Sequence, residues 1–235
     1  MQASKSVAQA DIYELDWEGR PAVMKDFSGR PWLVRVVLSR WIAAREARML
    51  RHLVDMRGVP RLLATAGPEA LIMERIDGAR IPRRRRGVRP PVEFWDRARR
   101  LIERLHERGI AHGDLRFKNV LIGPGGQPYL IDFATAMRRR PGQPGARLAE
   151  FFFLRCRRVD QFNFARMKAK FEPEGLDEDE QRWLGEAPLY LKIGRFLKKR
   201  VYRLKKPSFW RKLAPRSLRR RRRIKPDNPA RRGPS

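Results

Sequence analysis

Apolar and polar positions in the first third of the chain follow a strand-like pattern and then a helical one. Residues 11–26 carry two short apolar runs on either side of Glu18-Gly19, which predicts a β-hairpin. Between residues 32 and 53 apolar residues recur at spacings of three and four with arginines between them, which predicts a helix. Two further strand-like runs follow at residues 61–67 and 70–78.

The rest of the chain is mainly helical in pattern. A link rich in proline and arginine, IPRRRRGVRPP, precedes an amphipathic helix that ends at Gly109. The runs NVLIG and PYLIDF, joined by PGGQ, predict a second hairpin, and residues 147–171 predict a long helix. An acidic stretch and a further short helix come next. This order predicts an α+β fold with two lobes and a ligand cleft between them.

Charge divides the chain unevenly. The net charge is +29, and residues 191–235 hold 19 Lys and Arg against one acid, so they carry +18 of it. We therefore expect three parts: a β-rich lobe (1–80), a helical lobe (81–190) and a basic extension (191–235). With 42% hydrophobic residues the chain has enough apolar material for a core, and its cationic surface favours polyanions as partners.

Compartment signals are few. The single cysteine, Cys156, excludes an intrachain disulfide and suits a reducing cytoplasm. The first residues have no apolar segment typical of a signal peptide, and the longest apolar stretch is interrupted by Arg35 and Arg40. We expect no membrane span.

The segment HGDLRFKNVLIGPGGQPYLIDFATA carries candidate chemistry. Asp114 and Asn119 lie five residues apart, and Asp132 ends the following apolar run. Phosphoryl transfer requires a carboxylate that orients and deprotonates the acceptor hydroxyl, together with oxygen ligands for Mg²⁺. Asp114 suits the first task, and Asn119 and Asp132 suit the second. Taken alone, an Asp in a loop is usually a turn or helix-capping residue, so the interpretation depends on the residues together.

These motifs resemble the protein-kinase-like superfamily over roughly residues 4–170. In that resemblance AVMK supplies an ATP-binding lysine, Lys25, and AREARMLRHL supplies its partner, Glu46. LIMERIDG corresponds to the hinge, where backbone groups near Glu74 and Ile76 would meet adenine. The resemblance implies ATP and Mg²⁺ as cofactors. It implies that His112 braces the loop rather than reacts.

Four departures narrow the resemblance. No G-x-G-x-x-G precedes the first strands, and the Ser4–Ser6 region resembles the short phosphate loop of RIO-type atypical kinases. Gly113 replaces an arginine that precedes the acid in many kinases, so control through activation-loop phosphorylation is not expected. DFA replaces D-F-G, and no A-P-E motif follows. Only about a dozen residues separate Asp132 from the next helix, which leaves little platform for a protein substrate.

With these departures the chain most resembles bacterial lipopolysaccharide kinases of the Kdo/heptose group and their RIO-like relatives. The implied acceptor is a sugar hydroxyl of the lipopolysaccharide core at the cytoplasmic face of the membrane. Arg116 and Lys118 are cations near the candidate base, and Arg116 could contact the transferring phosphate or only offset local charge.

The basic extension has apolar residues at helical spacing among lysines and arginines. Residues 189–223 therefore predict a segment that binds an anionic membrane surface, or that packs on the helical lobe with its cations in water. No specific nucleic-acid recognition is expected. The expected location is cytoplasmic and peripheral on the inner face of the cytoplasmic membrane.

Two alternatives to the glycolipid kinase remain open. One is a RIO-like protein serine/threonine kinase with the same residues in the same roles. The other is a non-catalytic kinase-like scaffold that binds membrane or nucleic acid. Lys25, Asp114, Asn119 and Asp132 argue against the scaffold, and the glycine-poor phosphate loop argues for it.

Overall fold

The computed structural model describes residues 10–29, 39–82, 90–91 and 93–186. The chain divides into two compact units, residues 1–187 and 188–235. All described residues belong to the first unit. Ser4, Lys5 and Ser6, and the basic segment 189–223, lie outside the described residues, so their predicted roles stay predictions.

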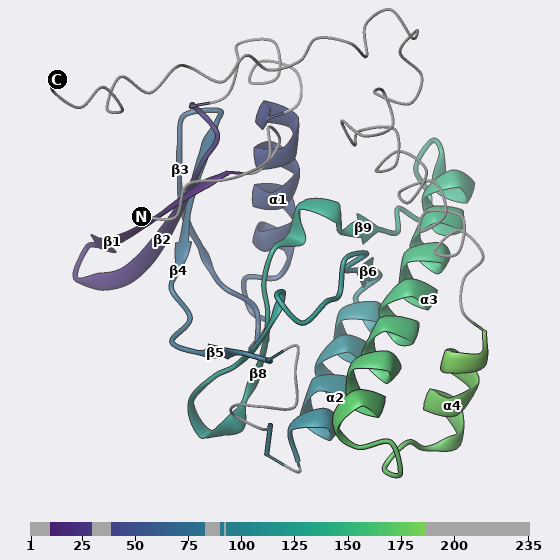
Figure 1. Ribbon diagram of the computed structural model, residues 1–235. Helices are drawn as coiled ribbons and strands as arrows, with labels where there is room; N and C mark the ends of the chain where they lie inside the picture. Colours follow the sequence, from purple (N-terminus) through teal and green to yellow (C-terminus); the bar gives the residue numbers. More distant parts are fainter. Residues whose placement is uncertain (1–9, 30–38, 83–89, 92, 187–235) are drawn as a thin grey trace, which may run out of the picture. The chain divides into compact units, whose positions relative to one another are not determined.

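The first strands form one antiparallel sheet in the order β1-β2-β4-β3 (Figure 1). Glu18 and Gly19 connect the first two strands with φ of 53° and 76°, the left-handed conformation that a two-residue hairpin turn requires. The predicted hairpin is therefore present. The four strands are β1 (Asp11–Trp17), β2 (Arg20–Asp26), β3 (Leu62–Ala66) and β4 (Ala70–Glu74).

Helix α1 (Arg40–His52) packs against this sheet. Its buried positions Ala43, Ala47 and Leu50 follow the three- and four-residue spacing seen in the sequence, and they join Leu71 and Met73 in the core. The part of the predicted helix before residue 39 lies outside the described residues. Because β2 is paired with β4 in the same sheet, the sheet holds α1 at a fixed position relative to β2.

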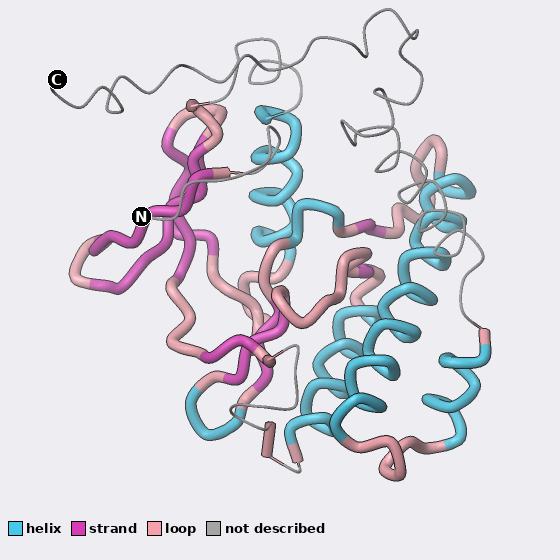
Figure 2. The backbone as a smooth tube through the Cα atoms, in the orientation of Figure 1, coloured by secondary structure: helices cyan, strands magenta, loops and turns pink. Residues whose placement is uncertain are grey.

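The later chain is mainly helical (Figure 2). In α2 (Phe94–Glu107) one stripe, including Ala98, Leu101 and Leu105, is buried, and Gly109 with φ of 69° follows its end. The long helix α3 (Ala146–Phe171) packs on α2 and on α4 (Glu178–Gly185). Asp177 caps α4 by accepting from the Glu180 N–H at 2.9 Å, and the Glu180 carboxylate accepts from the Asp177 N–H in return.

Short strands carry the loop between α2 and α3. Two small antiparallel sheets form, β5-β7-β8 and β6-β9. With the four-stranded sheet and the helices they confirm the predicted α+β class. The short elements are β5 (Ala79–Arg80), β6 (Ile110–Ala111), β7 (Val120–Ile122), β8 (Pro128–Leu130) and β9 (Met137–Arg138), with 3₁₀ turns at Pro124–Gly126 and Phe133–Thr135.

Among the helices that the structure describes, none combines the length and the apolar character that a membrane span requires.

Candidate active site

The loop after β6 is fixed by a buried histidine. His112 is fully buried, its Nε2 lies 3.0 Å from the carbonyl oxygen of Ile131, and its ring lies 4.9 Å from the ring of Phe133. The hydroxyl of Thr135 donates to the carbonyl oxygen of His112 at 3.2 Å. These contacts tie residue 112 to the segment around Asp132, which fits a bracing histidine rather than a reacting one.

Asp160 of α3 holds the same loop through backbone hydrogen bonds. Its carboxylate is fully buried and accepts the backbone N–H of His112 at 2.7 Å and of Gly113 at 2.9 Å. The same carboxylate lies 3.1 Å from Nε2 of His106 on α2. Sequence reasoning missed this residue. The sequence did contain a signal: Asp160 lies among apolar positions of a predicted helix. An acid at such a position indicates a buried carboxylate, and a buried carboxylate needs a partner.

Gly113 is required by the shape of the loop. It has φ of 75°, and a Cβ at this position would lie 3.0 Å from the carbonyl oxygen of Thr135. A side chain here would meet both backbone strain and a crowded neighbour. This explains locally why glycine precedes Asp114.

Asp114 and Asn119 are brought together by the loop. The side-chain nitrogen of Asn119 donates to the carbonyl oxygen of Asp114 at 2.8 Å and lies 3.2 Å from its Oδ2. Asn119 is buried, whereas the Asp114 side chain is about a quarter exposed. Arg116, half exposed, forms an ion pair with the same Oδ2 of Asp114. One partly exposed carboxylate is therefore held by an amide and a guanidinium.

Lys25 joins three elements that are far apart in the sequence. Its Nζ on β2 lies 2.6 Å from Glu46 Oε1 on α1 and 3.2 Å from Asp132 Oδ1 after β8. Glu46 is 1% exposed, so Lys25 is the counter-charge that makes its burial possible. Burial alone would lower the pKa of Lys25, but the two carboxylates outweigh it and hold this pKa above its ordinary value.

Asp132 lies in the left-handed conformation with φ of 72°, directly before the 3₁₀ turn at Phe133–Thr135. Burial acts to raise the pKa of Asp132, but Lys25, with help from Lys118, holds it below the ordinary value. The Nζ of Lys118 lies 3.7 Å from Asp132 Oδ2. Asp132 is thus a carboxylate kept ionised among cations.

The donor set fits Mg²⁺ shared with a nucleotide. The nitrogen of Asn119 is committed to Asp114, which leaves its oxygen as the metal-binding atom, and Asp132 supplies a carboxylate. Among the described residues there is no cluster of three or more His, Cys, Asp or Glu that could hold a metal. Mg²⁺ is commonly bound by one or two protein oxygens together with phosphates and water, so two ligands suffice.

The predicted hinge includes the end of β4, whose last residue is Glu74, and the residues that follow it. The backbone N–H of Glu74 already donates to the carbonyl oxygen of Arg61 at 2.9 Å, and its carboxylate accepts from the Arg61 N–H at 3.2 Å. Adenine recognition near Glu74 would therefore use another backbone group of this segment. Ile76 is half-buried just beyond the strand.

Arg45, next to Glu46 on α1, is a second residue that sequence reasoning missed. Its guanidinium donates to the carbonyl oxygen of Ala136 at 2.7 Å and lies 3.4 Å from that of Thr135. The contacts connect α1 to the segment after Asp132. An arginine among many arginines gives no sequence signal for this role.

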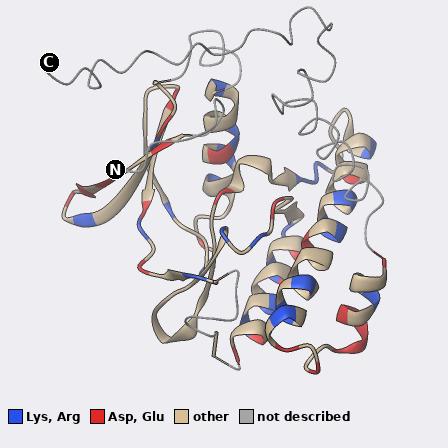
Figure 3. Ribbon diagram, in the orientation of Figure 1, with Lys and Arg blue, Asp and Glu red and all other residues tan. Residues whose placement is uncertain are grey.

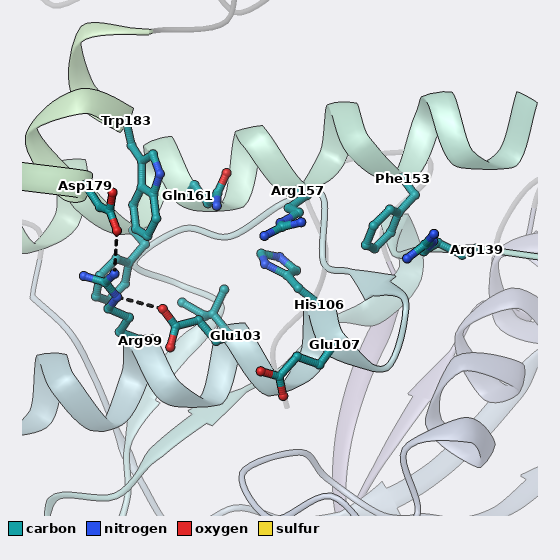
Figure 4. Close-up of a pocket in the computed structure, with 12 residues that line it drawn as sticks. Arg99, Glu103, His106, Glu107, Arg139, Phe153, Arg157, Gln161, Asp179 and Trp183 are labelled. Atoms are coloured by element: carbon teal, nitrogen blue, oxygen red, sulfur yellow. Dashed lines mark hydrogen bonds and ion pairs between the residues drawn. The ribbon is translucent and has the colours of Figure 1, made fainter. Parts of the chain in front are cut away.

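A cavity of about 510 Å³ lies apart from these residues, lined by α2, α3 and α4 (Figure 4). Arg99 is paired there with Glu103 and Asp179, and His106 reaches the wall. Among the residues that line the cavity, His106 contacts Asp160, and none is a predicted site residue.

Comparison with known proteins gives one family match. The model of the RIO domain matches residues 25–174, more than half of the chain. The match begins at Lys25 and includes Glu46, Asp114, Asn119 and Asp132.

Individual relatives are more distant. A 3-deoxy-D-manno-octulosonic acid kinase of Stenotrophomonas maltophilia is 36% identical over 104 residues, 41% of this chain and 42% of that protein. A probable bifunctional tRNA threonylcarbamoyladenosine biosynthesis protein of Methanothermobacter thermautotrophicus is 29% identical over 131 residues, 54% of this chain and 24% of that protein. The chain thus matches less than half the length of either relative.

Among solved structures, the Rio2 kinase from Chaetomium thermophilum in its ADP/Mg²⁺-phosphoaspartate complex aligns with a TM-score of 0.48 and 19% identity. The alignment covers 79% of this chain and 64% of that one.

Proposed function

The chain belongs to the RIO domain family, and on that premise we propose that it is an ATP- and Mg²⁺-dependent kinase that transfers the γ-phosphoryl group to a hydroxyl. The observation that carries the proposal is the cluster at Lys25. This cation contacts both Glu46 and Asp132, while Asp114 and Asn119 are hydrogen-bonded to each other in the braced loop.

Each residue has a task that its surroundings support. Asp114, held by Asn119 and Arg116, orients the acceptor hydroxyl and takes its proton. Lys25, held by Glu46, binds nucleotide phosphate oxygens. Asn119 and Asp132 would hold Mg²⁺, which supplies positive charge to the phosphates. Arg116 is half exposed and free to turn from Asp114 toward the transferring group.

For the acceptor we propose a sugar of the lipopolysaccharide core. Support comes from the relatives named for a kinase of 3-deoxy-D-manno-octulosonic acid and from the short segment of residues 133–145 between Asp132 and α3. A protein serine/threonine acceptor is the second candidate, and the RIO family match favours it. A glycolipid acceptor would place the protein peripherally on a membrane.

The test is transfer of γ-labelled phosphate from ATP, with purified lipopolysaccharide core and a basic protein as parallel acceptors. Asp114→Ala removes the proposed base, and Asp55→Ala is the matched control because Asp55 is an exposed acid paired with Arg108. We expect label on the glycolipid from wild type and from the control, with a loss of at least about a hundredfold in Asp114→Ala.

The outcomes separate the candidates. Label on the basic protein alone would reject the glycolipid acceptor and support the protein kinase. Turnover that Asp114→Ala leaves unchanged would reject the kinase. ATP binding in wild type and in Asp114→Ala, without phosphate transfer to either acceptor, would favour a scaffold.

A further inference from the structure

The first half of α3 exposes large apolar side chains. Leu148, Phe151, Phe152 and Leu154 are 61%, 50%, 45% and 44% exposed, and they account for four of the six large hydrophobic residues exposed in the described chain. In the same half Phe153 is buried, so apolar residues occupy the helix on both its inner and outer sides. On a surface helix the apolar residues normally form one buried stripe, so large apolar side chains on the outer side need a separate explanation. We name these four exposed residues the α3 patch.

The patch continues across a shallow cavity to α1. The cavity, of about 330 Å³, is lined by Leu148 and Phe152 of the patch and by Trp41 of α1, itself 56% exposed. Within the patch the rings of Phe151 and Phe152 lie 5.5 Å apart. Leu148, Phe151, Phe152 and Trp41 are therefore connected, and Leu154 follows Phe151 by three residues on the same helix. Connected apolar surfaces of this kind mark interaction sites.

Basic residues are frequent on the two helices that carry this surface: Lys and Arg positions recur along α3 and on α1 (Figure 3). The guanidinium of Arg155 lies 4.9 Å from the ring centre of Phe151, and Glu150, an acid on the same helix, is paired with Arg139 at 2.6 Å. A partner must therefore offer both negative charge and an apolar interior. The exposed arginines around the patch and cavity are Arg48, Arg138, Arg140, Arg147, Arg155 and Arg158.

We propose that the α3 patch docks on an anionic lipid membrane, with its apolar side chains entering the headgroup region and its arginines contacting lipid phosphates. This combination of exposed Phe, Leu and Trp with a cationic rim is what interfacial binding requires. Each arginine near an anionic surface adds attraction that salt weakens. The inference rests on the patch alone and stands whether or not the proposed kinase reaction is correct.

Two other occupants fit the charges poorly. A second copy of the chain would bring the same arginines face to face, which repels. Residues 191–235 carry 19 Lys and Arg against one acid, so this segment has the same sign as the rim. An anionic bilayer supplies the opposite charge and the apolar medium together.

The experiment reads the patch locally in the full chain, because the basic segment 191–235 can hold the protein on vesicles by itself. Phe151→Cys is combined with Cys156→Ala and labelled with an environment-sensitive fluorophore. Val54→Cys in the same background is the matched control, since Val54 is 60% exposed and lies outside the patch. Vesicles of equimolar phosphatidylcholine and phosphatidylglycerol are compared with phosphatidylcholine alone.

We expect a blue shift at position 151 with anionic vesicles only, and none at position 54. In unlabelled protein, Phe151→Ser with Phe152→Ser should weaken binding at least about tenfold, because two half-exposed rings no longer enter the interface. Co-sedimentation without a shift at 151 would overturn the proposal and assign binding to the basic segment. A probe at 151 already shielded before vesicles are added would also overturn it, because part of the protein would then cover the patch.

Discussion

Among the residues that hold the loop after β6, Asp160 should lower the free energy of unfolding most when it is substituted. In Asp160→Ala three donors lose their acceptor: the N–H groups of His112 and Gly113 and the ring of His106. A buried donor left unpaired costs about 1–3 kcal/mol. Because the substitution also removes the desolvation cost of the carboxylate itself, we take the lower end for each donor and expect a loss of about 3 kcal/mol in the free energy of unfolding.

The assay is urea unfolding of the full chain, followed by far-UV circular dichroism and tryptophan fluorescence. Asp160→Asn keeps the shape but turns one amide N–H toward other donors, so it should lose less than Asp160→Ala. Asp55→Ala, an exposed acid paired with Arg108, is the control and should unfold like wild type. A loss below about 1 kcal/mol in Asp160→Ala would refute the reasoning, because the three contacts would then contribute little to stability.

Lys25, Asp132 and Cys156 each allow a further test. Lys25→Met leaves Glu46 buried without its counter-charge, so it should lower the free energy of unfolding by about 3–5 kcal/mol. Adding Glu46→Gln should restore part of this loss, and no recovery in the double variant would contradict the pairing. The pKa of Asp132 is depressed in the folded state, so ionised Asp132 stabilises the fold fully above the ordinary carboxyl pKa, and this stabilisation is lost as pH falls through the lower folded pKa. The difference in the free energy of unfolding between wild type and Asp132→Asn should therefore shrink on acidification below about pH 4, and a constant difference would contradict the shift. Burial, with Asp160 nearby, raises the pKa of the Cys156 thiol to about 11. Because the thiolate is the reactive form, at pH 8 the folded protein should react with a disulfide reagent about a hundredfold more slowly than the urea-unfolded chain, and equal rates would contradict the raised pKa.

The sequence by itself determined most of the secondary structure, because periodicity and turn chemistry are local properties. The Glu18-Gly19 turn, the buried stripe of α2 and the glycine after it are legible in the residues and are present in the structure. The order of Lys25, Glu46, Asp114, Asn119 and Asp132 was also enough to nominate a site. Their chemical roles remain predictions for the transfer assay.

Only the tertiary structure decided how distant residues meet. Nothing in the local sequence around Asp160 states that it lies under residues 112 and 113, since that contact depends on how α3 packs against the loop after β6. The same holds for Arg45 and the carbonyl oxygen of Ala136. Periodicity also predicted α3 as a helix without showing that four large apolar side chains in its first half are left exposed, because exposure depends on which other elements reach each face.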